Sequence, residues 1–235
     1  MTATYGKIGI VGAMVEEIEL LHKHVKKSAS FVKAGIEYVE GTLHGREVIF
    51  CKSGVGKVNA AVCTQLLIDA GVDCVLFTGV AGALSPNLNI GDIVVSTTCI
   101  QHDMDCTPLG FARGQIPYQD VWKFEADKQI AALAIDACHR LFPGRGVAGT
   151  ILSGDQFIAS RETVRLLHKE LGGACTEMEG AALAQVCAMN GIPFVVIRAM
   201  SDKADGSAHI NFAEFTVEAA VNSHRIIEDM LQHMP

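Results

Sequence analysis

No stretch of this sequence approaches the roughly 20 uninterrupted apolar residues that a transmembrane helix needs. The first residues also lack a long apolar run behind a basic segment, which is the pattern of a secretory signal peptide. Both absences argue against export and against insertion into a bilayer. We therefore expect a cytoplasmic protein.

Clusters of positive charge are missing as well. The formal net charge is -7, and the longest run of basic residues is the pair Lys26 and Lys27. A chain with this balance repels phosphate backbones and anionic lipid headgroups. Nucleic acid and membrane surfaces are therefore not expected as partners.

The eight cysteines include no Cys-x-x-Cys pair, and most lie inside apolar runs such as residues 73–78. Free cysteines that fill core space in a reducing compartment explain this pattern better than a disulfide framework does. A His-Glu-x-x-His zinc motif is also absent. His102, Asp103 and Asp105 could be metal ligands, but an ordinary polar loop is the better interpretation, so we expect no metal site.

Apolar residues are abundant. Of 235 residues, 49% are hydrophobic and 19% are charged, which suits one globular domain spanning 1–235. Short β-branched runs alternate with segments of helical period, a pattern that predicts an α/β fold. Strands are expected at residues 7–11, 47–52, 74–78, 92–97 and 194–200. Helices are expected at residues 15–24, 57–69, 127–140, 161–171, 178–190 and 212–233, with Asn211 capping the last.

Glycine-rich junctions carry little information alone. Residues 9–12 lack the Gly-x-Gly-x-x-Gly spacing of dinucleotide sites, and residues 53–57 lack the full P-loop pattern. Residues 78–82 follow an apolar strand and are expected to form a turn that lets the backbone approach a ligand. The irregular stretch 103–124 predicts a long loop kept for function or assembly.

Several carboxylates lie next to the ends of predicted strands. Asp202 ends the run of residues 194–202, at the edge of the sheet where α/β proteins build active sites. Glu177 and Glu179 precede a helix of small residues, and Glu17 follows the first strand. Turn capping, helix-dipole pairing and a solvated helix face are alternative explanations for these acids.

Six short motifs occur together and in a fixed order. They are Gly-Ala-Met-Val-Glu-Glu at 12–17, Ser-Gly-Val-Gly-Lys at 53–57, Thr-Gly-Val-Ala-Gly at 78–82, Ser-Gly-Asp-Gln-Phe-Ile at 153–158, Glu-Met-Glu at 177–179 and Arg-Ala-Met-Ser-Asp at 198–202. In this combination the chain resembles the 5'-methylthioadenosine/S-adenosylhomocysteine nucleosidases over nearly its whole length. The resemblance implies a single-domain α/β/α sandwich with a central mixed, twisted sheet, shared with the purine nucleoside phosphorylases. It also implies a homodimer that hydrolyses the N-glycosidic bond of nucleoside thioethers.

The resemblance also implies roles for individual residues. Asp202 would donate a proton toward N7 of adenine, and Glu17 would activate the attacking water. Glu179, with Glu177 and the backbone of Met178, would hold the ribose hydroxyls. One acid near the base and one carboxylate-activated water address the charges that this reaction builds, so no metal or organic cofactor is expected.

Further contacts follow from the same resemblance. Arg198 would position the water network, Phe157 would stack on adenine, and the backbone of Ile158 would read the edge of the ring. Substrate contacts are also implied for Met14, Val80, Ser201 and Phe212. The loop of a partner subunit would close the pocket around the 5'-alkylthio group with Cys106, Leu109 and Pro117, which would face Met14, Val55 and Phe212.

Two residues depart from the family pattern. Val15 stands where many relatives have glutamate, and Val80 stands where many have serine.

Three alternative functions stay open. A purine nucleoside phosphorylase would need cationic phosphate donors, and Glu17 would repel phosphate. A non-catalytic nucleoside-binding protein has only Val80 in its favour. Aminodeoxyfutalosine hydrolysis could be a further activity.

Overall fold

A mixed β-sheet forms the centre of the computed structural model, which describes residues 5–204 and 208–235. The strands are β1 (Lys7–Gly12), β2 (Lys26–Lys33), β3 (Ile36–Leu43), β4 (Arg46–Lys52), β5 (Cys74–Ala83), β6 (Ile93–Gln101), β7 (Phe124–Glu125), β8 (Gly146–Ser153), β9 (Gly173–Glu177) and β10 (Phe194–Asp202). Strands β5, β10, β6, β8 and β9 pair in a closed ring. From β5 the sheet continues through β1, β4, β3 and β2.

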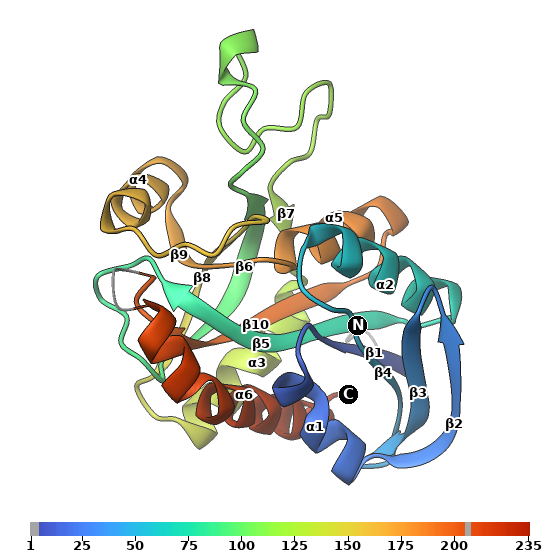
Figure 1. Cartoon of the computed structure of the whole chain (residues 1–235). Helices are drawn as coiled ribbons and strands as arrows, with labels where there is room; N and C mark the ends of the chain where they lie inside the picture. The colour runs from blue at the N-terminus through green and yellow to red at the C-terminus, as the bar shows by residue number, and fades with distance from the viewer. Residues whose placement is uncertain (1–4, 205–207) are drawn as a thin grey trace.

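Helices cover both faces of this sheet (Figure 1). The helices are α1 (Val15–His24), α2 (Lys57–Asp69), α3 (Lys128–Leu141), α4 (Arg161–Leu171), α5 (Gly180–Asn190) and α6 (Ala208–His233). Helix α6 packs on β5 and β10 and contacts both α1 and α3, whereas α2 and α5 pack on each other on the opposite face of the sheet. The α/β/α fold with a mixed sheet is therefore confirmed.

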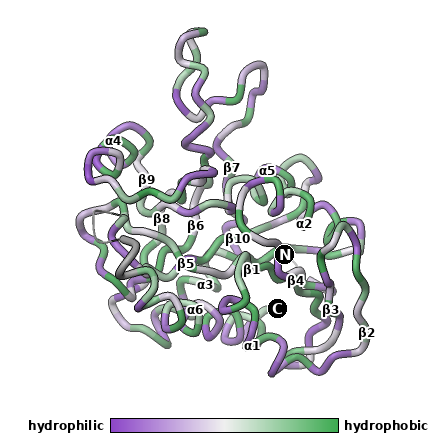
Figure 2. Tube along the Cα trace, in the orientation of Figure 1, coloured by the Kyte–Doolittle hydropathy of each residue, from purple (hydrophilic) through white to green (hydrophobic). Residues whose placement is uncertain are grey.

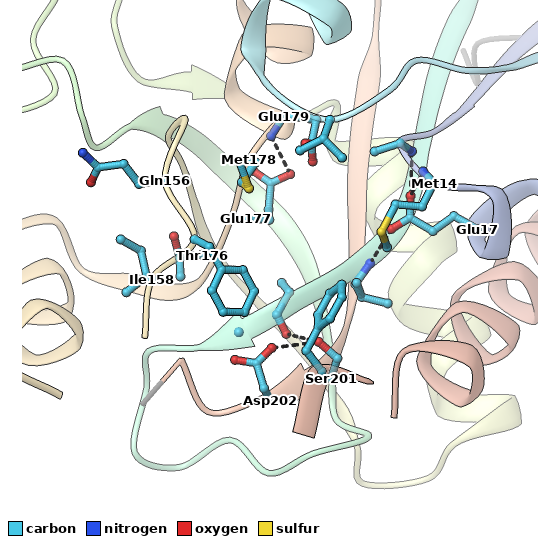
Figure 3. A pocket seen from close by; sticks show the side chains of 17 residues that line it. Met14, Glu17, Gln156, Ile158, Thr176, Glu177, Met178, Glu179, Ser201 and Asp202 are labelled. Carbon is cyan, nitrogen blue, oxygen red and sulfur yellow. Dashed lines mark hydrogen bonds between the residues drawn. The ribbon is translucent and has the colours of Figure 1, made fainter. Parts of the chain in front are cut away.

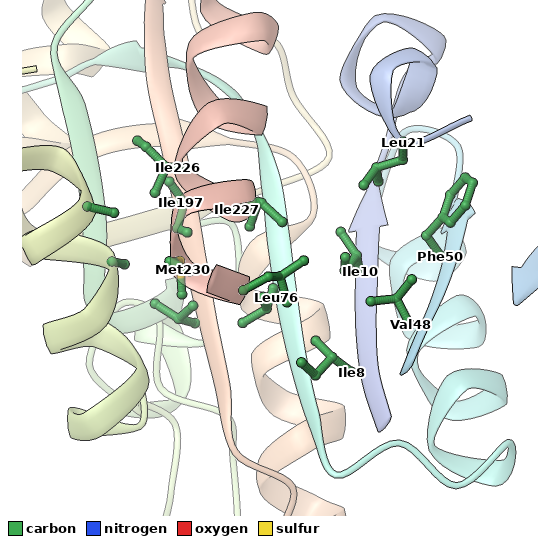
Figure 4. Close-up of a cluster of buried hydrophobic side chains, with 14 of the residues drawn as sticks. Ile8, Ile10, Leu21, Val48, Phe50, Leu76, Ile197, Ile226, Ile227 and Met230 are labelled. Carbon is green, nitrogen blue, oxygen red and sulfur yellow. The ribbon is translucent and has the colours of Figure 1, made fainter. Parts of the chain in front are cut away.

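Two apolar clusters hold the layers together. In the first, Ile8, Ile10 and Leu76 of the sheet pack against Ile227 and Met230 of α6 (Figure 4). Each such fully buried side chain stabilises the fold by roughly 1.5–3 kcal/mol relative to exposure. The second cluster lies under α2 and α5. Figure 2 shows the same distribution, with apolar residues along the central strands and polar residues on α4.

The sequence located the helices better than the strands. Helices α1, α2 and α4 have the predicted bounds, but α6 begins at Ala208, so Asn211 lies within the helix instead of capping it. Strands β2, β3, β7, β8 and β9 were not predicted. β2 is exposed along its length, and β8 and β9 are rich in small residues, so none has a clear apolar pattern.

The predicted turn at residues 78–82 is wrong. These residues continue β5, which runs to Ala83 and pairs there with β9 and β10. The long loop is confirmed: between β6 and β7 the chain projects away from the sheet (Figure 1) and contains one short 3₁₀ turn, Thr107–Leu109. Within residues 5–204 and 208–235, no helix combines the length and the apolarity needed to cross a bilayer.

Candidate active site

The carboxyl ends of β1, β5 and β10 meet at one edge of the sheet, because β5 runs parallel to both neighbours. A cavity of about 310 Å³ opens there, next to the end of β9. Its walls are formed by Ala13, Met14, Glu17, Val55, Val80, Ala81, Gly82, Gln156, Phe157, Ile158, Thr176, Glu177, Met178, Glu179, Ser201, Asp202 and Phe212. Figure 3 shows Asp202 and Ser201 on one side, Glu17 and Met14 on another, and Met178 and Glu179 on a third.

Glu17 lies in the first turn of α1 and is 4% exposed, so it does not belong to a solvated helix face. One carboxylate oxygen accepts from the backbone N–H groups of Ala13 at 2.6 Å and Met14 at 3.0 Å. The other accepts from the N–H of Val80 at 3.1 Å. Burial raises the pKa of Glu17, although Arg198 and these N–H groups counteract the effect. The result is a fixed carboxylate with an increased proton affinity.

Arg198 and Glu177 form a buried ion pair behind the cavity. The guanidinium Nη2 lies 2.5 Å from Glu177 Oε2, and both side chains are almost fully buried. Glu177 also accepts from the N–H of Gly180 and from the hydroxyl of Ser153. Glu177 thus accepts from the start of α5, in line with the alternative of helix-dipole pairing, and neutralises Arg198 as well.

The space available at position 79 explains why β5 carries glycine beside Arg198 and Glu17. A Cβ at Gly79 would lie 2.6 Å from Glu17 Oε1 and closer still to Arg198 Nη1. The strand must therefore lack a side chain at this point for the carboxylate and the guanidinium to occupy their positions. Arg198 Nη1 has no hydrogen-bond partner among the residues that the structure describes.

Glu179 is the N-cap residue of α5, and its side chain is turned toward the cavity. Its Oε1 accepts from the N–H of Gly56 at 2.8 Å. Burial, followed by the charge of Glu177, raises the pKa of Glu179 to about 8. The second motif, at residues 53–57, therefore contributes a backbone donor to the site rather than a phosphate loop.

Asp202 owes its position to an irregularity in β10. Met200 pairs with Ala81 and Asp202 pairs with Gly82, so Ser201 is an extra residue that bulges the strand. Asp202 accepts from the Ser201 hydroxyl at 2.9 Å and from the N–H of Ala204 at 2.6 Å. A Cβ at Gly82 would lie 2.7 Å from Asp202 Oδ1, so this second glycine also makes room for a carboxylate.

Apolar and aromatic side chains complete the wall. The rings of Phe157 and Phe212 meet edge to face with centroids 5.7 Å apart. Phe157 is half-exposed, which leaves its ring accessible to a ligand. Val80 lines the cavity, and its contact with Glu17 comes from the backbone.

The structure brings together most of the side chains predicted for the site. Arg198 lies behind the wall, and Cys106, Leu109 and Pro117 do not line the cavity. Ala13, Ala81, Gly82, Gln156 and Thr176 were missed. Thr176 precedes the Glu-Met-Glu motif directly, which is the one signal that pointed to it. Its buried hydroxyl has no hydrogen-bond partner among the described residues.

The base of the long loop is held by polar contacts. Lys57 Nζ binds Asp103 at 2.7 Å, and Asp103 also accepts from the N–H of Asp155 at 2.9 Å. The Lys57 ammonium and this N–H hold the pKa of Asp103 below its usual range despite partial burial. Asp103 therefore acts as an anchor for the loop.

Comparison with known proteins agrees with this geometry. The profile of the Phosphorylase superfamily matches residues 7–232, so the fold and the cavity define a member of that class. Over 230 residues the chain is 40% identical to a 5'-methylthioadenosine/S-adenosylhomocysteine nucleosidase of Geobacillus kaustophilus, and the alignment covers 97% of both proteins. The chain belongs to the 5'-methylthioadenosine/S-adenosylhomocysteine nucleosidase family, as its motifs indicated.

Solved structures show the same relationship. The nucleosidase of Neisseria meningitidis in complex with methylthio-immucillin-A superimposes with a TM-score of 0.92 at 38% identity, covering 97% of this chain and 99% of that one. The futalosine hydrolase of Helicobacter pylori superimposes with a TM-score of 0.90 at 34% identity, covering 96% of this chain and 97% of that one.

Proposed function

We propose that this protein hydrolyses the N-glycosidic bond of 5'-methylthioadenosine and S-adenosylhomocysteine, releasing adenine and the corresponding thioribose. The observation that carries the proposal is the placement of Glu17 and Asp202, which reach one cavity from different elements and lie in different environments. The names of the relatives supply the substrate class. The reaction consumes one water and needs neither a metal ion nor an organic cofactor.

Asp202 and Ser201 define what we call the base end of the cavity. Departure of adenine builds negative charge on the base, and a proton delivered to N7 neutralises it. Asp202 is the candidate donor, and the Ser201 hydroxyl at 2.9 Å fixes its orientation. Phe157 offers a ring face for stacking, and the backbone of Ile158 lies where it can bind the edge of the base.

Glu17, Glu177, Glu179 and Arg198 define the sugar end. Bond cleavage gives the ribose oxocarbenium character, and buried carboxylates stabilise that positive charge. Glu17 accepts a proton from the attacking water, while Arg198 Nη1 remains available to donate to it. Glu179, together with the backbone of Met178, holds the ribose hydroxyls, and Glu177 keeps Arg198 in place.

Water is favoured over phosphate as the nucleophile. None of the described residues that line the cavity is lysine, arginine or histidine. A phosphate dianion would therefore meet Glu17 and Glu179, and the one cation behind the wall, Arg198, is already neutralised by Glu177 and does not offset the repulsion. The same two carboxylates argue against a nucleoside-binding protein without turnover, since binding alone does not require them.

The pocket is completed, in our proposal, by a homodimer. The projecting loop exposes Leu109 at 71%, and Cys106 and Pro117 lie on the same loop, half-buried. A loop with this exposure suits a partner subunit whose Met14, Val55 and Phe212 line the open side of the cavity. Together these side chains would surround the 5'-thioether.

Aminodeoxyfutalosine is a second candidate substrate. The Helicobacter pylori futalosine hydrolase shares this fold over 96% of the chain, and aminodeoxyfutalosine and methylthioadenosine have adenine and ribose in common.

The eight cysteines are free, which fits a cytoplasmic enzyme. We place the main activity in methionine salvage and in removal of S-adenosylhomocysteine.

The test is to incubate pure protein with methylthioadenosine, with and without phosphate, and to identify the sugar product. Hydrolysis gives free methylthioribose at the same rate in both conditions. A sugar 1-phosphate that forms only with phosphate would make the protein a phosphorylase. Binding without any product would make it a nucleoside receptor. Aminodeoxyfutalosine, run in parallel, decides the second candidate.

A further inference from the structure

Four titratable side chains gather far from the cavity, where α1 ends beside α6. His224 and Glu228 are four residues apart on α6 and therefore share one face of the helix. His24 ends α1, and His44 lies in the turn between β3 and β4. None of these residues takes part in the proposed reaction.

Three of these four residues, His24, His224 and Glu228, place their ligand atoms in a compact triangle. His24 Nδ1 lies 3.4 Å from His224 Nε2 and 2.8 Å from Glu228 Oε1, and His224 Nε2 lies 3.5 Å from the same carboxylate oxygen. These three residues form the one group of three or more possible metal ligands among the described residues. The two imidazole nitrogens and the carboxylate oxygen thus lie within 3.5 Å of one another.

The dimensions of the triangle match a specific kind of ion. Zinc binds imidazole nitrogen and carboxylate oxygen at about 2.0–2.2 Å in tetrahedral sites, so neighbouring ligand atoms lie about 3.3–3.6 Å apart. Two of the three edges have this length. The third edge would need to lengthen by about 0.5 Å. The side chain of His24 can make this shift because it is 44% exposed.

We propose that His24, His224 and Glu228 bind one zinc ion. Two imidazoles with one carboxylate suit zinc and its neighbours in the transition series better than calcium or magnesium, which prefer oxygen ligands. The fourth position is open to water or to His44, whose Nε2 lies 3.6 Å from Glu228 Oε1. Exposure of His24 gives the ion a path from solvent.

The ion would connect two helices that both reach the cavity. Helix α1 carries Glu17 near its start and His24 at its end, about 10 Å away along the axis. Helix α6 carries Phe212 near its start. Zinc at this junction would tie α1 to α6 and stabilise the fold, without touching the reacting atoms.

The test uses untagged protein that has been stripped with a chelator and titrated with Co²⁺, which reports four-coordinate binding by its intense visible absorption. We expect one Co²⁺ per chain, displacement by Zn²⁺ but not by Mg²⁺, and a higher Tm with Zn²⁺. His24→Ala and Glu228→Gln should weaken binding by more than the roughly 10–100-fold that loss of an outer-shell contact causes. His139→Ala, which removes an exposed histidine from α3, is the matched control and should bind normally.

Equal Co²⁺ affinity in wild type and His24→Ala, or a spectrum of six-coordinate cobalt only, would overturn the site. Turnover of methylthioadenosine should be the same in His24→Ala and wild type, because His24 lies outside the cavity wall. Circular dichroism of each variant separates a lost ligand from a lost fold.

Discussion

The two ends of the cavity hold carboxylates in contrasting ways. At the sugar end, Glu17 and Glu179 are buried near Glu177 and the single guanidinium of Arg198, and the pKa values of both rise. At the base end, Asp202 sits on a β-bulge and is oriented by a hydroxyl and a backbone N–H. In our proposal, the same functional group therefore serves as a base at one end and as an acid at the other, because its surroundings set its task.

A change of one atom at the base end should remove most of the turnover. In Asp202→Asn the side chain keeps its shape but has no acidic proton to give to adenine. We expect kcat on methylthioadenosine to fall by about 10²–10⁴-fold, the usual contribution of a general acid. Steady-state kinetics and a thermal melt would measure the loss and show that the fold persists. A kcat close to that of wild type would assign the acid elsewhere.

The sugar end should lose turnover while it keeps binding. Glu17→Gln can still hydrogen-bond but cannot accept the proton of water, so we expect adenine release to fall by about 10²–10⁴-fold. Affinity for methylthio-immucillin-A, the ligand of the Neisseria relative, should change far less. In wild type, kcat/KM should fall as the pH is lowered, because Glu17 becomes protonated. Since the pKa of Glu17 is raised, this fall should occur at a pH above 4.5, the ordinary pKa of glutamate. An equal loss of binding and turnover would make Glu17 a structural residue.

The same contrast shows what the sequence could predict. Asp202 was recognised because it ends a long apolar run, where a carboxylate is costly without a task. The helical pattern alone did not separate Glu17 from Glu16, since both lie in the first turn of an amphipathic helix, and Glu17 was singled out through the resemblance to the nucleosidases. Only the fold shows that Glu17 is 4% exposed and accepts from Ala13, Met14 and Val80.

Glycine was the clearest source of error. Residues 78–82 were interpreted as a turn because glycine usually marks one, yet they belong to β5. Gly79 is required by the nearby side chains of Arg198, 119 residues away in sequence, and Glu17, 62 residues away, and Gly82 by that of Asp202, 120 residues away. Such a demand is long-range and leaves no local pattern. Strands β8 and β9 were missed for a related reason, because pairing rather than propensity forms them.

Removing a sugar hydroxyl should sharpen the comparison, because it affects one end only. A 2'-deoxy substrate would leave the buried Glu179 with the N–H of Gly56 but without the sugar hydroxyl as a donor, at a cost of about 1–3 kcal/mol. We expect kcat/KM to fall for the deoxy analogue in wild type and the ribo/deoxy ratio to shrink in Glu179→Gln. Competition assays with both substrates would measure this ratio. A wild type that does not distinguish the two would remove Glu179 from this role.

The protonation of Glu179 should also make the free energy of unfolding depend on pH. Its pKa is about 8 in the folded protein against 4.5 for an ordinary glutamate, so the folded state binds the proton more tightly. This stabilisation is complete below pH 4.5 and is lost as the pH rises through 8. Glu179→Gln stays neutral and should gain on the order of 4 kcal/mol relative to wild type between pH 5 and pH 8.5. Urea unfolding at both pH values measures the gain.

Glu162→Gln, at an exposed position on α4, is the control for this measurement and should show no such change. If Glu179→Gln and wild type differ by the same amount at both pH values, the carboxyl group does not titrate with a raised pKa in the folded protein.

The smallest expected effect concerns the side of the cavity that one subunit leaves open. Leu109 is 71% exposed on the projecting loop, and burying it against a partner's cavity would place it near the 5'-thioether. Loss of one CH₂-sized contact costs about 0.8 kcal/mol, or roughly fourfold in affinity. Leu109→Asp should therefore weaken both self-association and methylthioadenosine binding, with less effect on adenosine, which has a hydroxyl at that position. Leu166→Asp on α4 introduces the same charge at another exposed leucine and should change neither. Sedimentation velocity and steady-state kinetics would compare the two variants. A Leu109→Asp monomer with full activity would show that the loop packs only on its own subunit and that one chain forms the whole pocket.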